Sequence, residues 1–357
     1  MVLLLLVSIV GGVIWNVSSY VDFAVTRYST VKATSTLVPG PTGGGTGSQS
    51  NSTVPPAILA QLEAQATADE ELDAAEKQLS PEVPKGKFRV AALQFVSEFG
   101  KPEQNREALG RLIREAAEKK AQIVIMPEAA VPGYMAHDLQ TAWRDPVRRP
   151  NSKDGRSLVE ACVAEAVPGP STDFFGHLAA ELKIHIVATF IEKAEQDGKI
   201  DYFNTAVLLG PDGAIRAHYR KLNPWPIGEA TWAQAGDKGL AVVDTEFGKL
   251  GLLICYDLSC GVPEKLKAQG VTTLLYPIGW VCPNGEDWFE EMFPEKVKEL
   301  GLNVVGANWA LPEKAVGRAD WQGHGFSRIV RADGRILARG ADAGDDILYA
   351  DLDLPKP

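Results

Sequence analysis

The segments FRVAALQF (88–95), QNREALGRLIREAAEKK (104–120) and AQIVIMPE (121–128) follow one another in the chain. The first and last are short, mostly apolar runs of the kind that forms buried strands. The middle segment places its apolar residues on one face at helical spacing. A strand, a helix and a second strand in this order are typical of a mixed α/β fold.

The same alternation continues toward the C-terminal end. HLAAELK (177–183) predicts a helix before the strand IHIVATFIEK (184–193), and Pro211-Asp212-Gly213 marks the turn of a hairpin over 203–221. Further strands and helices are expected in 242–257, 263–280, 287–310 and a closing hairpin in 325–339. We therefore predict a single α/β domain over residues 86–354.

A different composition precedes this domain. Residues 1–21 carry no charged side chain, and about 20 apolar residues suffice for a helix to cross the hydrocarbon core of a bilayer. A cleaved signal peptide would require a Lys or Arg before the apolar run, and none is present. We therefore predict a transmembrane anchor over 1–25. A flexible linker rich in Gly, Ser, Thr and Pro over 26–55 and an amphipathic helix over 56–80 are expected next.

Two opposing signals bear on the side of the membrane that holds the domain. Arg27 and Lys32 follow the apolar run, which by the positive-inside rule would keep the domain in the cytoplasm. The linker and the glycosylation acceptor triplet Asn51-Ser52-Thr53 are typical of a domain outside it. We expect a membrane-anchored protein, with the balance favouring an extracytoplasmic domain.

Charge and cysteine content exclude several classes of protein. A net charge of -10 disfavours nucleic-acid binding, which needs a basic surface to neutralise phosphates. The four cysteines, at 162, 255, 260 and 282, form no CxxC pair and no Cys/His cluster with zinc-ligand spacing. The sequence therefore predicts no metal site and no nucleic-acid partner.

Three reactive side chains each follow a predicted strand. Glu128 ends the segment IVIMPE, Lys221 leaves the hairpin strand before LNPWP, and Cys255 follows the apolar run GLLI. Each residue alone has an ordinary explanation: a surface acid, a solvated loop lysine and an inert buried cysteine. Together they supply three chemical roles that complement one another.

A thiol becomes a strong nucleophile when a base removes its proton, and a carboxylate in a partly apolar site has its pKa raised toward the useful range. Glu128 fits that base. Negative charge then grows on the attacked group, and a fixed cation stabilises it in the transition state. Lys221 fits that cation, and the backbone N–H of Tyr256 is a second candidate donor to the same oxyanion.

These motifs resemble the nitrilase superfamily of carbon–nitrogen hydrolases, which carries a Glu-Lys-Cys triad in this chain order. PEAAVPGY (127–134), YRKLNPWPIGE (219–229) and GLLICYDLSCGVPE (251–264) match its three active-site segments. YFNTA (202–206), Gly279-Trp280 and the segment GHGFSRIVRADGRILA match secondary patterns. The resemblance implies a four-layer α-β-β-α sandwich and a second glutamate, Glu229, that holds the ammonium of Lys221.

The triplet Cys255-Tyr256-Asp257 resembles the amidase members of the superfamily. The resemblance therefore implies hydrolysis of a small-molecule amide through a Cys255 thioester, without metal or organic cofactor. Nitrile hydrolysis, acyl transfer through the same triad and a catalytically silent binding scaffold are the alternatives. Tyr134, Trp280 and His324 lie beside the motifs and are candidate pocket residues. A homodimer or larger homo-oligomer is also expected from the resemblance.

Overall fold

The computed structural model describes residues 79–98, 100–133, 164–226, 229–280, 288–311 and 325–355. The predicted anchor (1–25), the linker (26–55) and nearly all of the predicted amphipathic helix (56–80) lie outside these ranges, as do Tyr134 and His324. Within the described part of the chain, no helix combines the length and the apolar character needed to cross a membrane.

One sheet has the strand order β12-β1-β2-β3-β4-β5. β1, β2 and β3 run parallel to one another, whereas β12, β4 and β5 pair antiparallel with their neighbours. The bounds are β1 (Lys87–Gln94), β2 (Ile123–Ile125), β3 (His185–Gln196), β4 (Lys199–Leu209), β5 (Ile215–Arg220) and β12 (Asp346–Asp353).

The second sheet repeats this pattern with the order β11-β10-β9-β8-β7-β6. Its central strands β7, β8 and β9 are parallel, and the flanking strands pair antiparallel. The bounds are β6 (Ala241–Thr245), β7 (Gly248–Leu252), β8 (Thr273–Ile278), β9 (Asn303–Asn308), β10 (Arg328–Val330) and β11 (Ile336–Arg339).

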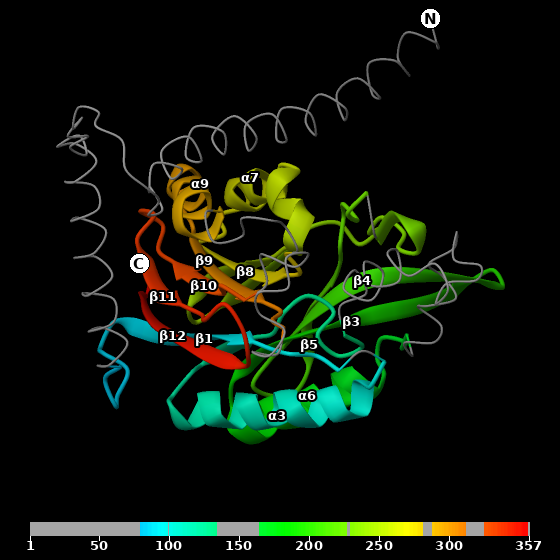
Figure 1. The fold of residues 1–357 in the computed structure, drawn as a ribbon, viewed down its shortest axis with the longest axis horizontal. Coiled ribbons are helices and arrows are strands. Elements are labelled where there is room, and N and C mark those ends of the chain that lie inside the picture. Colours follow the sequence, from blue (N-terminus) through cyan, green and yellow to red (C-terminus); the bar gives the residue numbers. More distant parts are fainter. Residues whose placement is uncertain are drawn as a thin grey trace, which may run out of the picture. The chain divides into compact units, whose positions relative to one another are not determined.

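Helices cover the outer face of each sheet (Figure 1). Alternate residues of β1 explain why: Val90 and Ala92 face a core shared with the second sheet, while Ala91 and Leu93 face the other way, toward the helices. A strand buried on both faces is mostly apolar, and the centre of β1, residues 90–93, has this pattern. The helices are α3 (Pro102–Glu118) and α6 (Pro170–Leu182) on the first sheet, and α7 (Val262–Ala268) and α9 (Phe293–Leu300) on the second. The predicted α-β-β-α layering is confirmed.

The hairpin turn predicted at Pro211-Asp212-Gly213 is confirmed between β4 and β5. Gly213 adopts a positive φ of 81°, and its N–H donates to the carbonyl of Gly210 at 2.8 Å. Glycine adopts this left-handed conformation without the steric cost of a side chain. The turn returns the chain along β4 and so brings Lys221, the residue after β5, next to Asn204 of β4.

The strand β12 was absent from the elements expected from sequence. It pairs antiparallel along the whole of β1, from Lys87 opposite Asp353 to Gln94 opposite Asp346. Its burial alternates: Leu348, Ala350 and Leu352 are buried, whereas Ile347 and Tyr349 on the other face are partly buried against the core under the helices. The strand joins residues far apart in the chain: the Arg89 guanidinium donates to both carboxylate oxygens of Asp351 at 2.7 and 2.9 Å.

The two sheets meet where four strands end. Glu128 follows β2, Lys221 follows β5, and Cys255 lies three residues after β7. The Glu128 N–H donates to the carbonyl of Ile278, the last residue of β8, at 3.2 Å. This hydrogen bond joins the first sheet to the second at the edge where the reactive side chains gather.

Candidate active site

Glu128, Lys221 and Cys255 converge from three separate strand ends. Their exposed fractions are 0%, 1% and 9%, so the carboxylate and the ammonium are removed from water. Buried charges are stable only when paired, and the Lys221 Nζ donates to Glu128 Oε1 at 2.6 Å. The structure thus places the two predicted charges in direct contact, with the thiol close enough to the Glu128 carboxyl to lower its pKa.

Glu229 contacts the same ammonium and lies in the segment that follows Lys221 in the chain. It begins the short 3₁₀ helix η2 (Glu229–Thr231), and its Oε2 accepts a hydrogen bond from the Lys221 Nζ. The Trp225 N–H also donates to Glu229 Oε2, at 2.7 Å, which fixes the carboxylate against the loop after Lys221. Lys221 is therefore held between two buried carboxylates, those of Glu128 and Glu229. The contact between Glu229 and the Lys221 ammonium is the one that the family resemblance implied.

Asn204 is a member of the site that the sequence analysis did not single out. It lies on β4, is 1% exposed, and its Nδ2 donates to Glu128 Oε1 at 2.6 Å and also to Glu229 Oε1. Its backbone carbonyl accepts the Lys221 N–H at 2.8 Å. Asn204 therefore bridges both glutamates and the lysine strand. Its position within YFNTA, one of the secondary motifs, was the signal that could have identified it.

The pKa values reflect burial opposed by charge pairing. Burial raises the pKa of Glu128, and the positive charge of Lys221 offsets part of that rise, leaving the pKa at about 7. Burial acts to lower the pKa of Lys221, but Glu128 and Glu229 outweigh it and hold that pKa well above its usual range. Lys221 is therefore a fixed cation, whereas Glu128 can take up and release a proton near neutral pH.

Cys255 opens a tight turn whose backbone is strained. It begins the 3₁₀ helix η3 (Cys255–Ser259) with a φ of 45°, a left-handed conformation that residues with a side chain rarely adopt. Its carbonyl accepts a hydrogen bond from the Tyr276 hydroxyl at 3.0 Å. Burial raises the pKa of the Cys255 thiol, with the Glu128 charge adding to the rise. The thiol therefore needs a neighbouring base to lose its proton.

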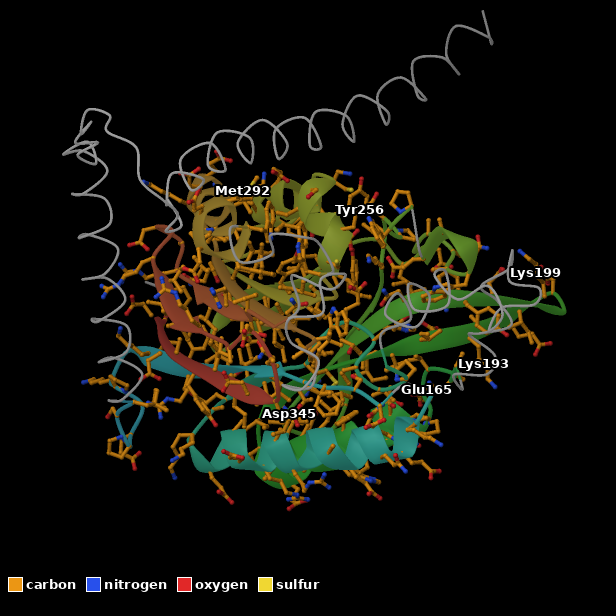
Figure 2. The ribbon with its side chains drawn as sticks, in the orientation of Figure 1. Glu165, Lys193, Lys199, Tyr256, Met292 and Asp345 are labelled. Atoms are coloured by element: carbon orange, nitrogen blue, oxygen red, sulfur yellow. The ribbon has the colours of Figure 1, made fainter. Side chains whose placement is uncertain are left out.

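Two further predicted residues, Tyr256 and Trp280, are each next in sequence to a residue of the site, Cys255 and Gly279 respectively. Tyr256, labelled in Figure 2, follows Cys255 in η3. Its side chain is half-buried. Trp280 stacks on Trp288 with ring centroids 4.7 Å apart, and the backbone N–H of Trp280 donates to Asn308 Oδ1 at 3.0 Å. The residue before it, Gly279, directs its N–H to the Cys255 sulfur and lowers the thiol pKa. The described residues therefore show Trp280 packed in an aromatic stack beside the site.

No cluster of three or more His, Cys, Asp or Glu side chains that could hold a metal ion occurs in the ranges that the structure describes. The carboxylates of Glu128 and Glu229 are paired with Lys221 and Asn204. The assembled groups are a buried thiol, a carboxyl that titrates near neutrality and a permanent cation. Such a set can carry out nucleophilic attack, proton transfer and stabilisation of an oxyanion.

Comparison with known proteins places these residues in one family. The family model for carbon-nitrogen hydrolases matches residues 89–356. The omega-amidase NIT2 of Bos taurus is 30% identical over 278 residues, covering 75% of this chain and 90% of that protein. A nitrilase of Pyrococcus abyssi is 27% identical over 270 residues, covering 74% and 90%.

Solved structures agree on the fold. An amidase from Nesterenkonia superposes with a TM-score of 0.58 at 21% identity, covering 76% of this chain and 92% of that one. Nit3 of Saccharomyces cerevisiae, a member of branch 10 of the nitrilase superfamily, gives a TM-score of 0.60 at 21% identity, with coverage of 76% and 93%. The family match over three quarters of the chain and the likeness to NIT2 lead to one conclusion: the chain belongs to the carbon-nitrogen hydrolase family and is an enzyme of that kind.

Proposed function

We propose that the enzyme hydrolyses the amide bond of a small molecule through a Cys255 thioester. The observation that carries the proposal is the asymmetry of the Glu128 carboxyl. Its Oε1 accepts hydrogen bonds from Lys221 and Asn204, while its buried Oε2 has no hydrogen-bond partner among the described residues. One oxygen is thus held in place and the other is available for a proton.

In the first half of the reaction Glu128 Oε2 takes the proton from the Cys255 thiol as the sulfur attacks the amide carbon. The carbonyl oxygen gains negative charge, which the Lys221 ammonium stabilises. The protonated Glu128 then gives its proton to the amide nitrogen, and the carbon–nitrogen bond breaks. The products of this half are a thioester on Cys255 and free ammonia or amine.

In the second half water replaces the amine. Glu128, again a carboxylate, takes a proton from water through Oε2 while the water oxygen attacks the thioester carbon. The sulfur leaves as a thiolate and receives that proton from Glu128, so the carboxylic acid is released and the site returns to its starting state. A pKa of about 7 suits Glu128 to both directions of proton transfer.

The choice of an amide rests on the curated relatives together with the amidase-like triplet Cys255-Tyr256-Asp257. Several relatives are named omega-amidases, and one carries the name nitrilase. The test is a panel of short aliphatic amides and the matching nitriles, with product analysis. Hydrolysis of amides with release of ammonia before deacylation supports the proposal, whereas turnover of nitriles alone contradicts it.

Substitution of the nucleophile is the first prediction. Cys255→Ala is expected to lower kcat/KM for amides by at least about 10³-fold, because no other group replaces the thiol. Cys260→Ala is the matched control: Cys260 lies five residues away, is half-buried, and is expected to be dispensable. Mass spectrometry of the trapped acyl-enzyme should find the adduct on Cys255. An adduct on Cys260, or full activity of Cys255→Ala, would contradict this mechanism.

We also propose that residues 1–25 anchor the enzyme in a membrane, with the catalytic domain outside the cytoplasm. The support is the uncharged stretch 1–21 and the linker that follows it. The full chain should sediment with membranes after carbonate washing, while a chain starting at Leu62 should remain in the supernatant. Release of the full chain by carbonate would contradict the anchor. Protease protection in sealed vesicles decides on which side of the membrane the catalytic domain lies.

We likewise propose that the enzyme is a homo-oligomer. Light scattering of the detergent-solubilised enzyme tests this proposal.

A further inference from the structure

We propose that Asp257 is a positioning residue that fixes Cys255 relative to Lys221. The inference rests on the amidase mechanism proposed above. Asp257 lies two residues after the nucleophile in η3 and is fully buried. Tyr256, labelled in Figure 2, separates the two residues in this turn.

Four hydrogen bonds end on the Asp257 carboxylate. Its Oδ1 accepts the Asn223 N–H at 2.9 Å and the Asn223 Nδ2 at 2.8 Å. Its Oδ2 accepts the Tyr219 hydroxyl at 2.7 Å and the Ile254 N–H at 3.1 Å. Each carboxylate oxygen thus accepts two hydrogen bonds, one for each of its lone pairs. All four donor groups are uncharged.

These donors come from both sides of the active-site lysine. Tyr219 precedes Lys221 by two residues on β5, and Asn223 follows it by two residues in the next loop. β5 belongs to the first sheet, whereas η3 continues from β7 of the second. Asp257 therefore connects the lysine segment of one sheet to the cysteine segment of the other, within the site itself.

Asp257 also braces the strained nucleophile. Its Oδ2 accepts the Ile254 N–H, and its own N–H donates to the Ile254 carbonyl at 3.0 Å, so two hydrogen bonds close around Cys255. A non-glycine residue with a φ of 45° persists only where the surroundings hold it. The carboxylate thus maintains the direction in which the thiol points.

The chemistry of the site demands a carboxylate here. An asparagine has the same shape, but its amide presents an acceptor on one side and a donor on the other. The Oδ1 side of Asp257 meets the backbone N–H of Asn223, and the Oδ2 side meets the backbone N–H of Ile254. In either orientation the NH₂ group of asparagine would face a backbone donor, so at least one of these bonds must break.

The first test compares Asp257→Asn with Asp237→Asn in the full-length enzyme. Asp237 is also an aspartate near the lysine segment, and its carboxylate accepts from the Arg220 guanidinium at 2.8 and 2.9 Å. Among the described residues, no hydrogen bond joins it to the cysteine turn. Asp257→Asn is expected to lower kcat by about 100-fold with KM changed less than about threefold, because displacement of the nucleophile affects the transition state more than binding. Asp237→Asn should keep kcat within about threefold.

The second test measures the position of the thiol without requiring turnover. The rate of alkylation of Cys255 by iodoacetamide is followed by peptide mass spectrometry from pH 5 to 9, a range that spans the pKa of about 7 of Glu128, the base that removes the thiol proton. A thiol moved away from Glu128 and Lys221 should show a shifted midpoint in Asp257→Asn, whereas a merely less stable protein would keep the midpoint of the folded fraction. Because no amide is involved, this readout distinguishes failure of the positioning role from failure of the amidase proposal.

Milder variants keep the proposal testable if Asp257→Asn does not fold. Tyr219→Phe removes one donor and Asn223→Ala removes a second, and each is expected to lower kcat about tenfold. Wild-type kcat and an unshifted alkylation midpoint in a folded Asp257→Asn, or in both milder variants, would overturn the inference. Equal losses in Asp257→Asn and Asp237→Asn would overturn it as well.

Discussion

At the scale of single residues, the decisive feature is that the two oxygens of Glu128 have different surroundings. Lys221 and Asn204 hold Oε1, and burial keeps the carboxyl pKa near 7. A carboxylate on the surface would titrate near pH 4 and would be too weak a base for a buried thiol. The catalytic property therefore belongs to the environment of the residue rather than to its type.

The pH dependence of activity follows from this pKa. Glu128 acts as the base when it is ionised, so kcat/KM should fall as the pH decreases through about 7. The negative charge of Glu229 raises the pKa of Glu128, so Glu229→Gln should move the acid limb to lower pH. Initial rates for an amide from pH 5 to 8 measure both. A limb at unchanged or higher pH in Glu229→Gln would show that this charge does not act on Glu128.

At the scale of elements, the pairing of β12 with β1 decides how the first sheet is completed. The Arg89 guanidinium is 1% exposed and depends on the Asp351 carboxylate, which accepts two of its hydrogen bonds. Loss of one partner of a buried pair leaves the other charge insufficiently bonded. This contact lies on the strands rather than at the strand ends that carry Cys255.

Asp351→Asn is therefore expected to lower the free energy of unfolding by about 2 kcal/mol while leaving kcat nearly unchanged. Asp353→Asn is the control on the same strand: its side chain is 66% exposed and pairs with the half-exposed Lys87, so its loss should cost less than about 1 kcal/mol. Urea unfolding of the three proteins measures the difference. Equal stability of both variants would mean that the buried contact contributes no more than the surface one.

At the scale of the whole molecule, the chain separates into Met1–Gln61 and Leu62–Pro357 by its internal contacts. Glu128, Asn204, Lys221, Glu229 and Cys255 all belong to the second unit. A unit with its own core and a complete site should act by itself. A chain that starts at Leu62 is therefore expected to keep kcat/KM for amides within about twofold of the full chain. A large loss in a folded, shortened enzyme would show that the first unit takes part in catalysis.

Local patterns predicted much of this architecture. The apolar runs of β1, β2 and β3 and the helical spacing of α3 indicated a mixed α/β fold, because a strand buried on both faces and an amphipathic helix leave direct marks in the sequence. The strand β12 was missed, since its identity depends on pairing with β1, about 260 residues earlier. Trp280 was predicted to line a pocket, and the structure shows its ring stacked on Trp288.

The sequence by itself determined the three reactive side chains, their order and their location after strands, because each is marked by an apolar run and by family motifs around it. The tertiary structure decided what those residues can do. It brought Asn204 to both glutamates, left one oxygen of Glu128 free of described hydrogen-bond partners, and placed Asp257 between the lysine and cysteine segments. These properties depend on distance, burial and direction across two sheets, and none of them is a function of spacing along the chain.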